Sequence, residues 1–290
     1  MRFSRQHLLI GLALFALYFI WGSTYLAMRI AIESLPPFMM AAMRFLAAGG
    51  ILYLFLRRQG ARAPTGKEWG GALLVGGLLL AVGNGGVAYA EQEVSSGVAA
   101  LAVATMPLWA AVFAGIWAHV PTKREWAGIL VGTAGVVVLN LGEEMQASPL
   151  GAVILLVAAA SWAFGSAWGR HLPMPKGAMA SAAQMLCGGA LLAAASWTRG
   201  EAVPQTVSMQ AAFALLYLIV FGSLIAYSAY LYLLNTVRPA LSTSYAFVNP
   251  LIALLLGAWL AGEAVGSAEF FALILIMLAV VLVLPLGRRS

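Results

Sequence analysis

The stretch Gly22-Ser23-Thr24-Tyr25 decides the fold, because a related stretch, Gly165-Ser166-Ala167-Trp168, follows it 143 positions later in a chain of 290 residues. The same spacing separates Met106-Pro107-Leu108 from Asn249-Pro250-Leu251. Each match is short, but one spacing that recurs along the chain indicates an internal repeat. The sequence therefore predicts two copies of one unit, in residues 1–145 and 146–290.

The composition shows which solvent surrounds these units. Hydrophobic residues make up 62% of the chain and charged residues only 9%, with a mean hydropathy of +0.92, whereas a soluble domain carries about 25% charged residues. Apolar runs of about 20 residues, the length that crosses a bilayer, alternate with short polar breaks. We therefore expect an all-α integral membrane protein without room for a soluble domain. The breaks place ten transmembrane helices at residues 8–31, 36–57, 69–90, 95–118, 125–141, 149–170, 176–198, 209–234, 240–261 and 267–286.

The few charges orient these helices. Thirteen of the 16 Lys and Arg residues fall in the two tails and in alternate breaks, all on one side of the membrane. The positive-inside rule then puts both termini in the cytoplasm. Because five helices per unit is an odd number, the second unit must cross the membrane in the opposite direction to the first. The basic residues are dispersed among short loops, which argues against a nucleic-acid surface.

Inverted repeats are typical of transporters, since two similar halves of opposite orientation can open a central site to either side. Broken helices at matching positions point to that site. Pro107 and Pro250 lie about halfway along the predicted helices 95–118 and 240–261, and each removes a helical hydrogen bond. The alternative is that both prolines only kink their helices. Polar and aromatic residues surround them: Thr105, Trp109, Ser242, Thr243, Ser244, Tyr245 and Asn249.

Aromatic and hydroxyl side chains accumulate in the first and sixth helices. Trp21 and Trp162 lie some 13 residues inside their helices, roughly 20 Å from the point of entry. They either fill the core of the bundle or line a cavity in which an aromatic face stacks on a ligand. The same two helices also bring Ser23, Tyr25 and Ser166.

Two polar residues stand out inside predicted spans. Asn84 lies between Gly83 and Gly85, and its buried amide needs a partner that a substrate can supply, although the glycines themselves are typical of close helix packing. The matching part of the eighth helix brings Tyr227. Arg44 is the one charge well inside a span, and intramembrane ionisable groups are functional candidates. Alternatively, Arg44 extends outward and pairs with Glu33, Glu91 or Glu93.

Some chemistry is not expected from this sequence. There is no Asp and no Glu at mid-membrane, and the histidines, His7, His119 and His171, fall near the predicted cytoplasmic ends. No metal site, cofactor site or nucleophile–base pair can be assembled from these residues, so we do not expect an enzyme. Any ion coupling has to use the outer glutamates, Arg44 or the substrate gradient alone.

Several stretches resemble the EamA repeat of the drug/metabolite transporter superfamily. In the first unit they are Trp21-Gly22-Ser23-Thr24-Tyr25, Arg29, Pro36-Pro37 and Arg44-Phe45-Leu46-Ala47-Ala48-Gly49; in the second they are Ser161-Trp162-Ala163-Phe164-Gly165-Ser166 and Ser244-Tyr245-Ala246-Phe247-Val248-Asn249-Pro250-Leu251. The similarity covers nearly the whole chain and fits the ten-helix exporter branch. It implies a bacterial inner-membrane exporter of amino acids, other metabolites or toxic compounds, with a central cavity between the two repeats.

We therefore expect a secondary transporter that exports small amphipathic metabolites, aromatic or apolar amino acids first, by alternating access. Its expected partners are a small-molecule substrate and membrane lipid, with no obligatory protein partner. The alternative is a non-transporting membrane sensor or assembly factor, which predicts a soluble output domain or long charged loops. The candidate substrate-binding residues are Trp21, Ser23, Tyr25, Arg44, Asn84, Thr105, Pro107, Trp109, Trp162, Ser166, Tyr227, Ser244, Tyr245, Asn249 and Pro250.

Overall fold

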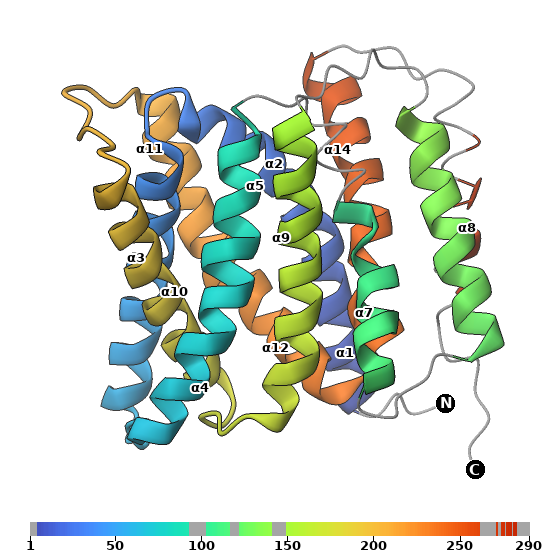
Figure 1. Cartoon of the computed structure of the whole chain (residues 1–290), viewed down its shortest axis with the longest axis horizontal. Coiled ribbons are helices and arrows are strands. Elements are labelled where there is room, and N and C mark those ends of the chain that lie inside the picture. The colour runs from blue at the N-terminus through green and yellow to red at the C-terminus, as the bar shows by residue number, and fades with distance from the viewer. Residues whose placement is uncertain are drawn as a thin grey trace.

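The computed structural model describes residues 5–92, 103–116, 122–140, 149–261, 271, 274–275, 277–279 and 281–282. All regular secondary structure within these ranges is helical. The helices stand side by side in one bundle (Figure 1). The prediction of an all-α protein is thus confirmed for the part of the chain that the structure describes.

The helices of the first half follow the predicted order. The predicted helix 8–31 is a run of α1 (Arg5–Ala16), η1 (Leu17–Trp21) and α2 (Gly22–Ile32), and it is followed by α3 (Pro37–Arg58). The predicted helix 69–90 consists of α4 (Gly66–Gly76), η2 (Gly77–Asn84) and α5 (Gly85–Ala90), and then come α7 (Met106–Ile116) and α8 (Lys123–Asn140). Residues 95–102, 117–118 and 141 of the next predicted helices lie outside the described residues.

The second half begins with α9 (Pro149–Trp168), the 3-10 turn η3 (Gly169–His171) and α10 (Ala178–Thr198). The predicted helix 209–234 consists of α11 (Met209–Tyr217), η4 (Leu218–Ile225) and α12 (Ala226–Thr236), and 240–261 of α13 (Pro239–Ser242) and α14 (Tyr245–Ala261). The predicted helix 267–286 lies largely outside the described residues, but those described between 271 and 282 are helical.

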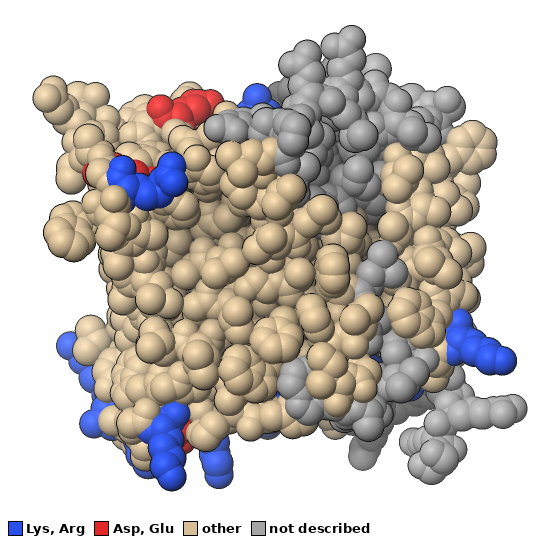
Figure 2. All heavy atoms as spheres, viewed as in Figure 1, with Lys and Arg blue, Asp and Glu red and all other residues tan. Residues whose placement is uncertain are grey.

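Six helical runs within the described ranges are long and apolar enough to cross a membrane: Arg5–Ile32, Pro37–Arg58, Gly66–Ala90, Val153–His171, Ala178–Thr198 and Met209–Thr236. A broad belt without charged atoms covers the face seen in Figure 2, and most Lys and Arg atoms on this face lie at one end of the belt. Large apolar side chains such as Phe15, Leu54 and Phe213 point outward from the helices. Such a surface suits lipid rather than water.

Three of these runs contain a π-helical turn. Two of the turns, η2 and η4, lie at corresponding places in the two halves, and the third, η1, precedes α2. A π turn disturbs the regular hydrogen-bond ladder and is frequent at functional sites. Side chains from neighbouring helices bind carbonyl groups in two of the turns: Ser161 Oγ donates to Leu78 O in η2 at 2.9 Å, and Trp21 Nε1 donates to Gly222 O in η4 at 3.0 Å.

Glycines allow α3, α4 and α10 to approach one another closely. A Cβ atom on Gly49 of α3 would lie 2.9 Å from the backbone nitrogen of Leu186 in α10. A Cβ atom on Gly76 of α4 would lie 2.5 Å from the carbonyl oxygen of Gln184 in the same helix α10. Because both neighbours are backbone atoms, a side chain at either glycine would push the helices apart.

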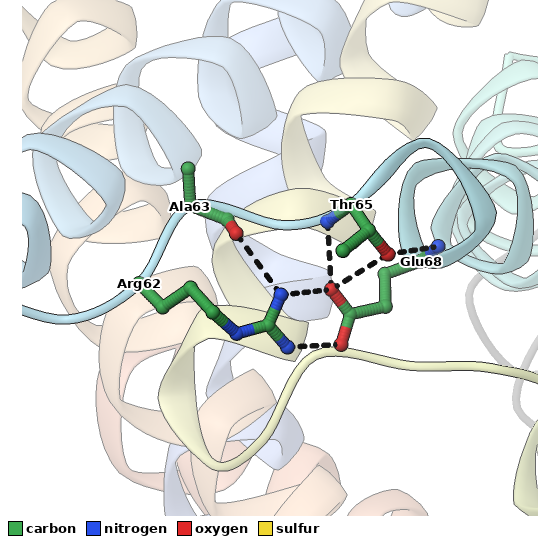
Figure 3. A network of polar contacts seen from close by, with 4 residues as sticks. All are labelled: Arg62, Ala63, Thr65 and Glu68. Carbon is green, nitrogen blue, oxygen red and sulfur yellow. Dashed lines mark hydrogen bonds and ion pairs between the residues drawn. The ribbon is translucent and has the colours of Figure 1, made fainter.

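A polar network fixes the connection between α3 and α4 (Figure 3). Thr65 and Glu68 form a reciprocal capping box: Thr65 N donates to Glu68 Oε2 at 2.7 Å, and Glu68 N donates to Thr65 Oγ1 at 3.4 Å. Arg62 adds two bonds, from Nη1 to Oε2 at 3.0 Å and from Nη2 to Oε1 at 2.6 Å. The network sets the start of α4 and hence the register of the run that carries η2.

A second cap lies at the other end of α3. Pro36 occupies the N-cap position and makes no side-chain hydrogen bond there. Glu201, which follows α10, caps the helix instead, because its Oε1 and Oε2 accept hydrogen bonds from Phe38 N at 3.1 Å and Met39 N at 2.8 Å. The Phe38 ring stacks on Tyr89 of α5 with centroids 5.6 Å apart. Glu201 thereby ties the first half of the chain to the second at this end.

Candidate functional site

A cavity lies within the bundle, lined by residues of both predicted units. Its volume open to the centre of a water molecule is about 70 Å³, and one water needs about 10–15 Å³ on this measure. The cavity therefore holds a few waters, and a larger solute requires its wall to move. Eight of the predicted residues line it: Trp21, Tyr25, Arg44, Asn84, Trp162, Tyr227, Tyr245 and Asn249.

One side of the cavity is an aromatic cluster built from four helical runs. Trp21 lies at its centre, with ring centroids 4.8 Å from Tyr245, 5.3 Å from Tyr230 and 5.6 Å from Trp162. The contacts with Tyr245 and Trp162 are edge-to-face, the arrangement that aromatic rings favour. The two tryptophans thus pack with the core and also line the cavity, and stacking of their faces on a ligand stays a prediction.

Arg44 brings a cation to the wall of the same cavity. Its residue is only 2% exposed, and its Nε donates to Ser223 Oγ in η4 at 2.7 Å. A Cβ atom on Gly222 would lie 2.8 Å from Arg44 Nη2, so the glycine makes room for the guanidinium. Among the described residues, no carboxylate lies within ion-pair distance of Arg44. Arg44 therefore lines the cavity, and of its predicted partners Glu33 and Glu91 make no ion pair with it, while Glu93 lies outside the described residues.

Asn84, the last residue of η2, supplies an acceptor. Its Oδ1 atom is buried and has no hydrogen-bond partner among the described residues. The adjacent Gly83 leaves room for Trp162, since a Cβ atom there would lie 2.8 Å from the indole Cε3. One cavity thus combines a buried cation, an unoccupied acceptor and an aromatic wall.

Comparison with known proteins identifies the family. Residues 8–141 and 149–284 each match the EamA-like transporter family. The chain belongs to this family. The resemblance of its motifs to the drug/metabolite transporter superfamily is therefore confirmed.

Relatives of this EamA-like transporter are known in several organisms. It is similar to the inner membrane transporter YedA of Escherichia coli (strain K12), with 49% identity over 289 residues that cover 99% of this chain and 94% of YedA. It is also similar to protein PecM of Dickeya dadantii (strain 3937), with 27% identity over 276 residues covering 93% of this chain and 91% of PecM. A solved crystal structure matches with a TM-score of 0.78 at 20% identity and covers 94% of this chain and 95% of its own, which shows a shared fold.

These findings decide the class of protein. The family and the relatives indicate a transporter rather than an enzyme, and they disfavour a non-transporting sensor or assembly factor. Together with the apolar spans they indicate a multi-pass protein of the inner membrane.

The seven other predicted residues do not line the cavity of this EamA-like transporter. Hydroxyl groups among them are satisfied elsewhere: Ser23 Oγ donates to Ile20 O at 2.8 Å, Ser166 Oγ lies 2.6 Å from the Tyr230 hydroxyl, and Ser244 Oγ lies 2.8 Å from the Tyr18 hydroxyl. Ser166 therefore acts behind the wall, where it holds a ring of the aromatic cluster. The seven residues are Ser23, Thr105, Pro107, Trp109, Ser166, Ser244 and Pro250.

The two prolines differ in position from each other. Pro107 is the second residue of α7, which starts after a turn at Thr105; residues 103–104 before this turn are helical, and residues 95–102 of the predicted helix lie outside the described residues. A missing N–H costs nothing in a first helical turn. Pro250 does lie inside α14, as expected. Neither ring reaches the cavity, and Trp109 beside Pro107 stacks on Phe113 with centroids 6.1 Å apart.

Asn249 has a structural task besides lining the cavity. With its amide nitrogen directed toward α1 and η1, it donates to Leu17 O and Tyr18 O at 3.2 Å and to Tyr245 O at 3.1 Å. The first two carbonyl groups belong to the first two residues of the π turn η1, where the regular ladder is interrupted. Asn249 therefore joins α14 to the first run and supports the backbone that carries Trp21.

Several lining residues were not predicted. Thr24 and Met28 lie three and seven residues after Trp21, and Val87 lies three residues after Asn84. Residues at this spacing share one helix face, so the helical period extended from the predicted residues would have found them. Gly222 carries no such signal, because its role is to leave space for Arg44.

A second cavity lies beside α9, α10 and α12. It has about 600 Å³ open to the centre of a water molecule, and Arg170 and Lys176 are among its lining residues. Tyr227 lines the central cavity and Gln184 lines this second one, and the Tyr227 hydroxyl donates to Gln184 Oε1 at 2.5 Å. The boundary between the two cavities is thus held by a hydrogen bond between α12 and α10.

Proposed function

We propose that this transporter exports small amphipathic metabolites, with aromatic and apolar amino acids as the leading class and toxic amphipathic compounds as a further one. The observation that carries the proposal is the central cavity, in which Arg44, Asn84 and the Trp21 cluster face one space. The names of YedA and PecM leave the solute open; YedA is named as an inner membrane transporter.

The residues around the cavity complement a zwitterion with an apolar side chain. The guanidinium of Arg44 offers charged N–H groups to a carboxylate, and charge-assisted hydrogen bonds are among the strongest in proteins. Asn84 Oδ1 can accept a hydrogen bond from an ammonium group, and Trp21 and Trp162 offer aromatic faces to the solute's side chain. With Arg44 as the single buried cation at this wall, a solute with several negative charges would be poorly neutralised.

We further propose that the solute passes by alternating access between two five-helix units, residues 1–145 and 146–290, with ten spans and both termini in the cytoplasm. The large cavity beside Arg170 and Lys176 would then face the cytoplasm, since basic residues favour that side. The matching π turns η2 and η4 are suited to act as hinges, because they weaken the helical ladder in both units at corresponding places.

Counterflow in proteoliposomes tests the solute class. Vesicles loaded with unlabelled L-phenylalanine should take up labelled L-phenylalanine in a saturable way, and L-leucine and L-tryptophan should compete. Empty vesicles, and vesicles that carry the Trp21→Ala/Arg44→Gln double variant, serve as controls. No saturable exchange of any amino acid across a panel of the 20 common ones would refute the amino-acid proposal.

A further inference from the structure

Glu91 is a buried acid that the proposed binding mode leaves unused. It follows α5 directly, one residue beyond the span Gly66–Ala90. Both of its carboxylate oxygens are buried, and neither has a hydrogen-bond partner among the described residues. A buried charged group without partners is costly, so the position of this carboxyl calls for a functional reason.

The helical period places Glu91 on the cavity side of its run. Asn84 and Val87 line the cavity, and Glu91 lies seven and four residues beyond them, on the same helix face. One helical turn, about 5.4 Å, separates Val87 from Glu91. Glu91 is not itself among the residues that line the cavity; it lies one turn beyond them on the same helix face, toward the end of the bundle capped by Glu201.

The groups that act on Glu91 come from two neighbouring helices. Arg29 and Tyr25 of α2 and Arg44 of α3 interact with it electrostatically. Tyr89, two residues before Glu91, does not act on it in this way. The Tyr89 ring packs against Arg199, whose guanidinium carbon lies 4.8 Å from the ring centroid. Among the described residues, Glu91 and Arg44 thus attract each other electrostatically but do not form a salt bridge.

A cation and an acid that attract each other without an ion pair suit a zwitterion. In the proposed binding mode, a solute carboxylate at Arg44 directs the solute ammonium toward Asn84 Oδ1 and the helix face that Glu91 shares with it. Burial raises the pKa of the Glu91 carboxyl to about 8, because desolvation outweighs the attraction of Arg29 and Arg44, which lowers it. Without solute the carboxyl therefore holds a proton at neutral pH, and an arriving ammonium group favours its ionised form.

We propose that Glu91 is the proton-exchange site of this transporter, at which the ammonium group of the solute and a proton compete for one carboxylate. The proposal rests on the proposed export of zwitterionic solutes. On the outer side, the solute leaves and a proton binds to a Glu91 oxygen. On the cytoplasmic side, this proton leaves to water as the next solute binds. Each cycle then exchanges one zwitterion outward for one proton inward and moves one positive charge into the cell.

The proton site is tested without any solute by infrared spectroscopy of the full-length protein in lipid nanodiscs. A carboxylic-acid C=O band should disappear with a midpoint near pH 8 as the pH rises, and it should be missing in Glu91→Gln. Glu33→Gln is the matched control, because Glu33 is exposed near the same end of the bundle, and it should keep the band. A wild-type protein without this band, or a band that persists in Glu91→Gln, overturns the proposal.

The exchange is tested in proteoliposomes with labelled L-phenylalanine. An inward gradient of L-phenylalanine should drive protons out of wild-type vesicles, and a pH gradient should drive solute accumulation. Glu91→Gln should bind L-phenylalanine more weakly and lose both couplings, and Glu33→Gln should behave as wild type in counterflow and in both couplings. Accumulation driven by a pH gradient in Glu91→Gln overturns the proposal. A wild type without any amino-acid counterflow refutes the proposed function instead, and the infrared band then still decides whether Glu91 holds a proton.

Discussion

At the scale of single residues, the proposed class of solute depends most on Arg44. A buried guanidinium bound to Ser223 Oγ, with no described carboxylate at ion-pair distance, needs an anion from elsewhere. Its neighbour Phe45 lies against it, with 4.8 Å from the guanidinium carbon to the ring centroid. The guanidinium is thus held by contacts on two sides, and under the proposed function it favours a solute with a carboxylate over one that is only apolar.

The first prediction concerns this selection. Arg44→Gln should weaken L-phenylalanine binding by about 10–100-fold, because hydrogen bonds to charged groups contribute about 1.5–3 kcal/mol. Phenethylamine, which lacks the carboxylate, should compete poorly in wild type. Equilibrium binding of labelled L-phenylalanine to the detergent-solubilised protein measures both effects. Arg58→Gln, at the exposed end of α3, should bind normally; equal affinity in both variants would remove Arg44 from the binding site.

The second prediction follows from the raised pKa of Glu91. A folded-state pKa of about 8 against an unfolded value of about 4.3 means that the folded state binds this proton more tightly. The stabilisation is complete below about pH 4.3 and is lost as the pH rises to about 8. Glu91→Gln should therefore gain thermal stability relative to wild type between pH 5 and pH 9, as followed by the unfolding temperature in nanodiscs. A difference independent of pH would contradict the shift.

At the scale of the helices, close packing through glycine is the main device. Gly49 and Gly50 are neighbours in α3, yet only Gly49 meets α10; nothing lies within 4 Å of a Cβ atom on Gly50. This difference gives a matched pair. Gly49→Ala should destabilise the protein by about 1–3 kcal/mol through overpacking, while Gly50→Ala should stabilise it by about 0.5–1 kcal/mol through helix propensity. Chemical unfolding of both variants measures the contrast, and equal stabilities would refute it.

The cap on α3 yields a further element-scale prediction. Glu201 accepts hydrogen bonds from two backbone N–H groups at the start of this helix, where Pro36 makes no side-chain cap. Glu201→Ala should cost about 0.5–2 kcal/mol, as the loss of an N-cap does. Glu33→Ala removes an exposed carboxylate near the same end and should leave the unfolding free energy unchanged. If both variants unfold alike, the cap contributes nothing.

The helices themselves were predictable from local signals, and their irregularities were not. The described helices begin and end close to the polar breaks and prolines. A helix that crosses a bilayer needs a long apolar run, and the connections between such helices are marked by Pro, Gly or charged residues. A π turn such as η2 changes only the hydrogen-bond register, so Gly77–Asn84 reads like ordinary helix. Pro107 was placed mid-helix for the same reason: hydropathy does not show the turn at Thr105.

The same distinction separates the site residues that line the cavity from those that do not. Asn84 and Arg44 could be found because amide and charged groups are rare inside a span, and Trp21 because it lies far from the point where its helix enters the membrane. Whether the Ser23 hydroxyl lines the cavity could not be predicted from the sequence. Its hydrogen-bond partner, the Tyr217 hydroxyl at 2.6 Å, lies 194 positions away along the chain. Thr24 and Met28 needed only the helical period, applied to residues already chosen.

At the scale of the whole molecule, two cavities and the boundary between them suggest the path of the solute. The bond from Tyr227 to Gln184 joins helices α12 and α10 at this boundary. Tyr227→Phe should ease opening by about five- to tenfold, because a buried hydrogen bond contributes about 1 kcal/mol. In a Cys187→Ser background, a cysteine substituted for Thr24 in the central cavity should then react faster with a water-soluble thiol reagent applied at the Gln184 end.

Tyr217→Phe is the control for this last prediction, since Tyr217 contacts Ser23 and does not line either cavity. It should leave the rate of thiol reaction unchanged. A rate that is the same in Tyr227→Phe and wild type would mean that the boundary opens elsewhere.

The buried position of Arg44 has a consequence for the balance of the transport cycle. At the spacing of 143 that relates the two halves, its counterpart in α10 is Cys187, which carries no such charge. Two identical inverted halves would give inward-open and outward-open forms of equal free energy. Under the proposed alternating access, a buried cation at this position in the first half without a charged counterpart in the second removes this degeneracy, and we expect the empty transporter to favour one of its two open forms.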